Sequence, residues 1–260
     1  MKKLLNILLI LLAAIGLGSC ERDNYDGPDA GVEGVILNKI TGDTMQLSQG
    51  GGNFSLRIVE TSYAHGDSTV VVSPQGLNMK QDGTFLNTKL FAGTYEMYPW
   101  ESCCYEGKES KQIVGLKSGS RTKVVFEVTP YFEIEWVDEP WQDDEGFVHA
   151  AFTFKANPTP DASYTPARPE KAQLFISKSE KVGTGSDARY TNNEYTVSTF
   201  DEGNVIELIT KAPIDFTQRF WLRVGVKAHA DGAHGVYDKY CLSKIKTLDC
   251  VGHSSNQSGN

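Results

Sequence analysis

The fold class follows from the stretch Phe220-Trp221-Leu222-Arg223-Val224-Gly225-Val226-Lys227-Ala228, in which apolar and polar positions alternate. A period of two places alternate side chains on opposite faces of a β-strand. Shorter alternating runs occur at residues 54–58, 124–128 and 132–136, and Phe152/Phe154 and Leu174/Ile176 mark further strands. No long stretch repeats apolar residues at helical spacing. We therefore predict an all-β protein of antiparallel strands with one face toward solvent, arranged as β-sandwiches.

A proline divides this pattern into two predicted domains. Pro130 separates the runs at 124–128 and 132–136, and proline interrupts the hydrogen-bonded ladder of a sheet. The 260-residue chain is long enough for two domains of roughly 100–150 residues. We predict one β-sandwich over residues 31–129 and a second over residues 130–252. Residues 253–260 are expected to form a flexible tail.

The first predicted domain contains two motifs with a clear structural meaning. They are Gln81-Asp82-Gly83-Thr84-Phe85 and Leu90-Phe91-Ala92-Gly93-Thr94-Tyr95. Asp82-Gly83 favours a tight turn, and Gly93 favours a second turn into the strand that carries Tyr95. This pattern resembles the transthyretin-like, carboxypeptidase-regulatory-like β-sandwich, which repeats D-G-x-F followed by L-x-x-G-x-Y.

The second predicted domain resembles a fibronectin type III or immunoglobulin-like sandwich. Residues 220–228 are similar to the sixth strand of such a domain, and a glycine-rich loop at 230–235 follows them. Trp136 is similar to the buried tryptophan of these domains, so we expect it in the core. The proline-rich segment 157–169 should form a long loop.

The first residues predict export and a lipid anchor. Lys2 and Lys3 precede an apolar run that is too short to span a membrane, which is typical of a signal peptide at residues 1–19. Leu17-Gly18-Ser19-Cys20 resembles the lipobox of bacterial lipoproteins, in which the cysteine thiol is acylated. Residues 20–30 would then be the lipidated Cys20 and a flexible, acidic tether. Ordinary cleavage that leaves Cys20 unmodified is the alternative.

The order of these segments resembles an uncharacterised family of two-domain Bacteroidetes lipoproteins that accompany SusC/SusD-type glycan uptake systems. The acidic residues after Cys20 are similar to the signal that sends such lipoproteins to the outer face of the outer membrane. The resemblance implies an accessory role in polysaccharide capture at the cell surface, with polysaccharide and SusC/SusD-type proteins as partners. It supplies no binding residues.

Composition and motifs argue against two other classes of function. The chain has 25 basic and 33 acidic residues, a net charge of −8, and no basic stripe for nucleic acid. It contains no G-x-S-x-G, H-E-x-x-H or glycine-rich phosphate loop, so we predict neither enzyme activity nor a cofactor. A glycoside hydrolase with an unrecognised carboxylate pair is the remaining catalytic alternative.

Aromatic residues on polar strand faces are the best candidates for a binding site. Sugars stack their C–H faces on aromatic rings, while polar side chains bind their hydroxyl groups. Tyr98 and Trp100 share one strand face, Trp221 lies beside Arg223, and Trp141 lies in an acidic loop. These four aromatic residues are the candidate glycan-binding residues. They could instead cover a sheet edge or fill the seam between the domains, in which case the protein would be a docking module for a transporter complex.

Two clusters were considered as metal ligands. Asp143, Asp144 and Glu145 offer carboxylates that could hold Ca²⁺, although their spacing lacks the calcium-loop pattern. His229 and His234 flank Asp231 and could ligate Zn²⁺, but one flexible loop makes a poor cage. The preferred interpretation is that neither cluster binds a metal.

The remaining candidates are covalent modifications. In an exported protein Cys103, Cys104, Cys241 and Cys250 could form disulfides, and Cys241–Cys250 would be a local clip. Crosslinks from Cys103 or Cys104 to the later pair would join the domains, and free thiols are the third alternative. Thr44 and Ser68 lie in D-[ST] motifs similar to Bacteroidetes O-glycosylation sites.

Overall fold

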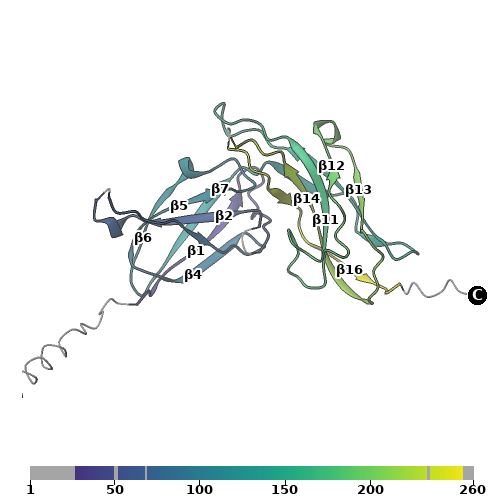
Figure 1. Ribbon diagram of the computed structural model, residues 1–260, viewed down its shortest axis with the longest axis horizontal. Coiled ribbons are helices and arrows are strands. Elements are labelled where there is room, and N and C mark those ends of the chain that lie inside the picture. Colours follow the sequence, from purple (N-terminus) through teal and green to yellow (C-terminus); the bar gives the residue numbers. More distant parts are fainter. Residues whose placement is uncertain (1–26, 50–51, 68, 233–234, 254–260) are drawn as a thin grey trace, which may run out of the picture.

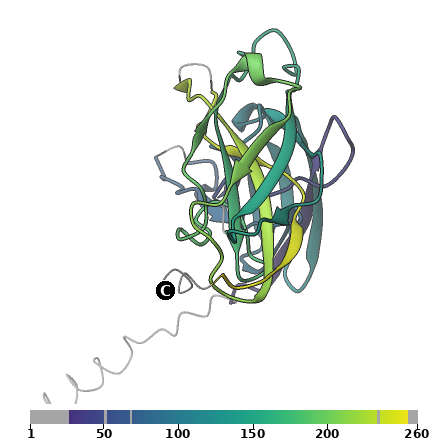
Figure 2. The ribbon, with the colours of Figure 1, turned by 90° about the vertical axis from the view of Figure 1, so that its right-hand side faces the viewer.

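The computed structural model describes residues 27–49, 52–67, 69–232 and 235–253. Two groups of β-sheets lie side by side, one built from residues 30–128 and the other from residues 132–250 (Figure 1). In the perpendicular view the second group lies in front of the first (Figure 2). We call them the first and second sandwich. Cys20, Ser68 and His234 lie outside the described residues, as do the predicted signal peptide and most of the predicted tether and tail.

The first sandwich consists of two sheets. One has the strand order β4 (Thr84–Leu90), β1 (Ala30–Asn38) and β7 (Arg121–Val128); the other has β3 (Gln75–Leu77), β2 (Ser55–Glu60), β5 (Gly93–Trp100) and β6 (Gln112–Leu116). The β1–β7 pair is parallel, unlike the antiparallel pairing expected from the sequence. The rest of the sandwich separates these two strands along the chain, so no hairpin fixes their relative direction.

The predicted turn at Asp82-Gly83 is present before β4. Gly83 has a φ of +77°, a conformation that glycine adopts without steric cost. The Asp82 carboxylate accepts hydrogen bonds from the backbone N–H and the hydroxyl of Thr84, at 3.0 and 2.7 Å. A Cβ atom at Gly83 would lie 2.7 Å from the Met45 carbonyl oxygen, so a larger residue would not fit here.

The second sandwich is antiparallel throughout its described ladders. One sheet contains β13 (Ile206–Ile209), β10 (Val148–Ala156), β8 (Phe132–Trp136) and the short β9 (Trp141–Gln142). The other contains β12 (Tyr195–Thr196), β11 (Pro169–Ser177), β14 (Gln218–Ala228), β15 (Tyr240–Leu242) and β16 (Lys246–Cys250). The proline-rich segment before β11 is a loop, as predicted.

Three short 3-10 turns lie wholly within the described part of the chain: η1 (Ser62–Ala64), η2 (Lys108–Ser110) and η3 (Thr199–Asp201). Within that part, no helix has the length and apolar character needed to cross a membrane. The all-β fold class predicted from the alternating pattern is therefore confirmed.

On strand β14, the burial of one face agrees with the sequence prediction and the burial of the other face does not. Phe220, Leu222 and Val224 are fully buried in the second sandwich, as their alternation predicts. The opposite face was expected to meet solvent, yet Arg223 on that face is also fully buried. The first sandwich covers this face, because β14 lies at the seam between the two sandwiches.

Polar contacts cross the seam at buried positions. The Arg223 guanidinium donates to the Leu47 carbonyl oxygen at 2.7 Å and to the Ser243 carbonyl oxygen at 2.8 Å. The Asn53 amide donates to the Tyr240 carbonyl oxygen at 2.9 Å. Burial lowers the pKa of the Arg223 guanidinium, and the hydrogen bonds to carbonyl oxygens compensate for its desolvation.

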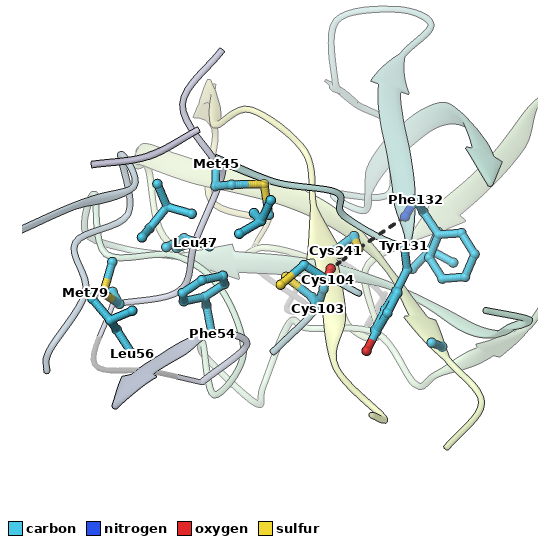
Figure 3. Packing of buried hydrophobic residues seen from close by; sticks show 14 of the residues in the cluster. Met45, Leu47, Phe54, Leu56, Met79, Cys103, Cys104, Tyr131, Phe132 and Cys241 are labelled. Carbon is cyan, nitrogen blue, oxygen red and sulfur yellow. Dashed lines mark hydrogen bonds between the residues drawn. The ribbon is translucent and has the colours of Figure 1, made fainter. Parts of the chain in front are cut away.

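Apolar packing also continues through the seam (Figure 3). Cys103 and Cys104 of the first sandwich lie beside Cys241, Tyr131 and Phe132, and all five are buried. The Phe132 backbone N–H lies 3.4 Å from the Cys241 Sγ. One buried cluster therefore includes residues of both sandwiches, and this shared core holds them together.

The Cys241–Cys250 disulfide considered from the sequence is wrong. Cys241 is opposite Val226 on β14, and Cys250 is opposite Gln218. That separation along one strand corresponds to roughly 26 Å, whereas the Cα atoms of a disulfide lie within about 7 Å. All four described cysteines are buried free thiols, and Cys103, Cys104 and Cys241 gather at the seam instead.

Candidate functional site

A cleft of about 400 Å³ opens where β5 ends, between the two sandwiches. We call it the Trp100 cleft. Strand β5 and η2 contribute from the first sandwich, while the proline-rich loop and the loop before β15 contribute from the second. Its size falls within the range of small-ligand sites, which often lie between domains. The lining residues are Pro99, Trp100, Glu101, Tyr105, Glu106, Gly107, Lys108, Glu109, Ser163, Tyr164, Gly235 and Tyr237.

Tyrosine packing fixes the wall of the Trp100 cleft. The Tyr105 ring makes edge-to-face contacts with Tyr131 and Tyr164, at centroid distances of 5.0 and 5.9 Å. The Tyr105 hydroxyl accepts a hydrogen bond from the backbone N–H of Ala167 at 3.0 Å. These contacts join the two sandwiches at the cleft, so Tyr164 is held in place even though it lies in a long loop.

Trp100 is half-buried at the end of β5. The Arg57 guanidinium lies 3.8 Å from the centroid of the indole ring, and Tyr98 meets the ring edge at a centroid distance of 6.3 Å. The Trp100 Nε1 is buried and, within the described residues, has no hydrogen-bond partner. Arg57 therefore covers one part of the indole, and Trp100 contributes apolar surface to the cleft rather than a hydrogen-bond donor.

Three polar groups of the Trp100 cleft are available for a ligand. Among the residues that the structure describes, the Glu101 carboxylate, the Lys108 ammonium and the Tyr237 hydroxyl make no hydrogen bond or ion pair. Glu101 also has a φ of +46°, a region that non-glycine residues rarely occupy. Such backbone strain tends to occur at functional sites, where neighbouring structure holds it.

The cleft tyrosines remain hydrogen-bond donors over a wide pH range. Burial and the neighbouring Glu109 carboxylate raise the pKa of Tyr164 to about 12, and its hydroxyl donates to Glu109 at 3.1 Å. Burial, Glu101 and Glu109 also raise the pKa of Tyr237. Both phenols are therefore neutral at physiological pH, when they combine an apolar ring with a polar hydroxyl.

The four aromatic residues proposed from the sequence do not form one surface. Trp100 lines the cleft, but Tyr98 is only 3% exposed and packs against Trp100 from within. Trp221 is half-buried and packs beside Phe175, Val182, Tyr240 and Leu242 on the face of β14 toward the first sandwich. Tyr98 and Trp221 therefore lie among packed side chains rather than on one exposed aromatic surface, and their binding role stays a prediction.

Trp141 is the most exposed of the four, at 51%. Its ring stacks on the His149 imidazole with a centroid distance of 4.1 Å and an interplanar angle of 11°. His149 in turn bonds to Asp143 at 2.9 Å and to Glu207 at 2.7 Å. Trp141 therefore presents one ring face away from the stack, at a place separate from the Trp100 cleft.

The calcium interpretation of the acidic loop receives no support from the geometry. The Asp143 Oδ1 accepts backbone hydrogen bonds from Glu145 and Phe147, and its Oδ2 bonds to His149. This carboxylate closes the turn and has little capacity left for a cation. Asp144 and Glu145 are both exposed. Throughout the described ranges, no cluster of three or more His, Cys, Asp or Glu side chains could hold a metal ion.

A second cleft, of about 370 Å³, lies elsewhere along the seam. Trp136, expected in the core, is only partly buried and lines this cleft, with its Nε1 donating to the Lys244 carbonyl oxygen at 2.9 Å. Lys244 pairs with Asp43 at 3.1 Å, and Glu133 accepts hydrogen bonds from two asparagines. Much of its polar lining is already partnered, which favours the Trp100 cleft. Thr44, an O-glycosylation candidate, is exposed at this second cleft.

Sequence patterns missed most of the Trp100 cleft. Tyr164 and Tyr237 lie in loops, where no periodicity marks the direction of a side chain. Glu101 directly follows β5. Its neighbour Trp100 was the one residue through which the sequence pattern indicated this cleft. The tyrosines come together only because the two sandwiches meet.

The architecture and the cleft define a class: a two-sandwich, all-β protein with an aromatic-lined cleft between its domains. Residues 30–129 match the family model described as the N-terminal domain of DUF3823, a protein of unknown function. No curated protein matches the chain.

Solved structures share this fold over most of their length. A DUF3823 family protein from Bacteroides uniformis has 21% sequence identity and a TM-score of 0.70, covering 85% of this chain and 99% of that chain. A DUF3823 family protein from Parabacteroides merdae has 22% identity and a TM-score of 0.62, with coverage of 86% and 100%. A third, from Bacteroides uniformis, is described as a "putative carbohydrate binding protein"; it has 17% identity, a TM-score of 0.65 and coverage of 86% and 100%. At these identities the likeness establishes the fold.

Proposed function

We propose that this protein is a lipid-anchored, cell-surface accessory protein of a polysaccharide-utilisation system, and that it binds glycan without cleaving it. The observation that carries the proposal is the Trp100 cleft, with its four aromatic rings and its unpartnered polar groups. The solved structure described as a "putative carbohydrate binding protein" shares this fold, which agrees with this proposal.

The chemistry of the cleft suits a sugar. Tyr164, Tyr237 and Trp100 offer apolar ring surface for C–H faces. Glu101 can accept hydrogen bonds from sugar hydroxyls, and Lys108 can donate them. Apolar surface with a few placed polar groups is the usual composition of a small-ligand site.

The proposal assigns no catalytic step to the cleft. Glu109 accepts hydrogen bonds from the Gly107 backbone N–H and the Tyr164 hydroxyl, so it holds the loops in place. Glu106 accepts hydrogen bonds from Thr129 at 2.6 and 2.9 Å and has a similar role. A hydrolase would release reducing ends from a polysaccharide. An assay for reducing ends therefore distinguishes the hydrolase alternative from non-catalytic binding.

Titration calorimetry with a panel of polysaccharides tests the binding role. Tyr237→Ala should weaken any binding at least about fivefold, as expected when a central aromatic contact is lost. Tyr195→Ala is the matched control, because Tyr195 is 51% exposed on β12 and does not line the cleft. Absence of binding across the panel would contradict the proposal and favour the docking-module alternative. A fixed protein partner in pull-downs from outer membranes would then support that alternative.

The anchor is tested separately on cells. The intact protein should fractionate with the outer membrane and incorporate labelled fatty acid, and Cys20→Ser should abolish both. Proteolysis of intact cells should digest the protein if it faces outward. A protein that incorporates no fatty acid would contradict the anchor without affecting the binding role.

A further inference from the structure

We propose that the Trp100 cleft selects uncharged glycans and rejects those that carry carboxylate or sulfate groups. This inference rests on the proposed function and specifies its ligand class. Two observations carry this inference: which charged residues line the cleft, and whether each of them is hydrogen-bonded, ion-paired or exposed.

Carboxylates outnumber cations in the lining of the Trp100 cleft. Glu101, Glu106 and Glu109 line it, and Lys108 is the one cation among the residues that form its described walls. Glu106 is 9% exposed and accepts two hydrogen bonds from Thr129. Glu109 accepts hydrogen bonds from Gly107 and Tyr164. Both carboxylates are therefore fixed in position, and neither has a cationic partner among the residues that the structure describes.

Glu101 adds an exposed carboxylate to the lining of the Trp100 cleft. Its carboxylate is exposed and unpartnered within the described chain, and it raises the pKa of Tyr237, as does Glu109. Glu101, Glu109 and Tyr237 all line the same cleft. A sugar stacked on the Tyr237 ring would meet both carboxylates.

The nearby cations offset this charge only in part, although Arg57 lowers the pKa of Tyr237 while Glu101 and Glu109 raise it. The Arg57 guanidinium stacks on the Trp100 indole, and Arg57 does not line the cleft. Lys108 lies on an exposed turn, where its ammonium is well hydrated. The negative charge that repels a carboxylate or sulfate on the ligand would therefore exceed the positive charge that attracts it. Partial exclusion of water from the cleft strengthens this repulsion.

A neutral sugar meets no such penalty. Its hydroxyls can donate to the carboxylates of Glu101 and Glu109, and hydrogen bonds to ionised acceptors are stronger than those between neutral groups. The same acidic groups thus favour a hydroxyl-rich, uncharged ligand and disfavour an anionic one.

Matched polysaccharide pairs test the inference on the full chain. Each pair has the same linkage, and one member is neutral while the other is its uronate: β-1,4-mannan with polymannuronate, and cellulose oligosaccharides with their C6-oxidised counterparts. In low salt the neutral member of a binding pair should bind at least about tenfold more tightly. The ratio should shrink at about 0.5 M salt, because salt screens charge repulsion.

Variants show whether the cleft carboxylates cause the selectivity. Glu101→Gln and Glu109→Gln should each reduce the neutral-to-uronate ratio, and the double variant should reduce it most. Glu135→Gln, which removes an exposed carboxylate outside this cleft, should leave the ratio unchanged. Thermal denaturation confirms that each variant is folded.

The outcomes separate the two proposals. Uronates that bind as tightly as their neutral counterparts, or a ratio unaffected by salt and by the two substitutions, would overturn the inference and leave glycan binding intact. Failure of both members of every pair to bind would instead contradict the proposed function.

Discussion

The Arg223 guanidinium donates a 2.7 Å hydrogen bond to the Leu47 carbonyl oxygen, which links the central strand of the second sandwich to the first. A second bond from the same group reaches the Ser243 carbonyl oxygen. Arg223, Leu47 and Ser243 are all essentially inaccessible to solvent. The positions of the cleft residues on the two sandwiches depend on this seam.

Arg223→Met should lower the free energy of unfolding by about 2–5 kcal/mol, because it leaves two buried carbonyl oxygens without donors. Chemical denaturation measures the change. Arg219→Met is the matched control on the same strand, since its ion pair with Asp249 is exposed, screened by solvent and expected to contribute little. Equal effects of the two substitutions would show that the seam contributes no special stability.

The four described cysteines provide a test of the seam's core. In the Cys20→Ser protein, a thiol reagent should react slowly or not at all with the native state and with four thiols after unfolding, because all four are buried and free. Burial also raises the pKa of the Cys104 and Cys241 thiols, and the unreactive thiol form therefore predominates. Fewer than four reactive thiols in the unfolded chain would reveal a disulfide.

The His149 cluster should make stability depend on pH. Although burial opposes protonation, the hydrogen bonds that the His149 ring donates to the Asp143 and Glu207 carboxylates raise the pKa of His149, and the bond with His149 lowers the pKa of Asp143. The histidine contribution is complete below the unfolded-state value of about 6.5 and is lost as pH rises through the raised pKa. The Asp143 contribution is present above about 3.8 and is lost as pH falls through its lowered pKa.

His149→Gln should therefore destabilise the protein more at pH 5 than at pH 9, measured by urea unfolding at both values. His229→Gln serves as the control. The His229 side chain is half-exposed, and its 3.7 Å contact with the Glu170 carboxylate is longer than either contact of His149 with a carboxylate. A His149 effect that is the same at both pH values would mean that charge on the imidazole plays no part.

Trp221 should contribute to stability and leave binding unchanged. Its ring packs with Phe175, Tyr240 and Leu242, so Trp221→Ala should lower the free energy of unfolding by about 1–3 kcal/mol. Polysaccharide affinity should be unchanged at a temperature where the variant is folded. Selective loss of affinity, with native stability, would restore Trp221 as a binding residue.

Local patterns predicted the strands well, but they could not show what covers each strand face. The alternation at 220–228 correctly places Phe220 in the core. It also suggested that Trp221 and Arg223 meet solvent, because the period identifies two faces and carries no information about a neighbouring domain. The same limitation explains Tyr98, which lies on the predicted face and is nevertheless buried.

The cleft itself depends on contacts between residues far apart in the sequence. Trp100 could be proposed from its strand, whereas Tyr164 and Tyr237 lie in loops of the other sandwich. Glycine-dependent turns were more predictable, since Asp82-Gly83 determines its own geometry locally. Residues 30–129, which match the family model, contain only part of the cleft lining.

The affinity of the wild-type protein and of Tyr237→Ala for the same polysaccharide tests the central claim most directly. Calorimetry should detect binding by the wild-type protein, and the variant should bind at least about fivefold more weakly while its unfolding midpoint stays close to that of wild type. Equal affinity of the two folded proteins would contradict the claim that the Trp100 cleft is the glycan-binding site.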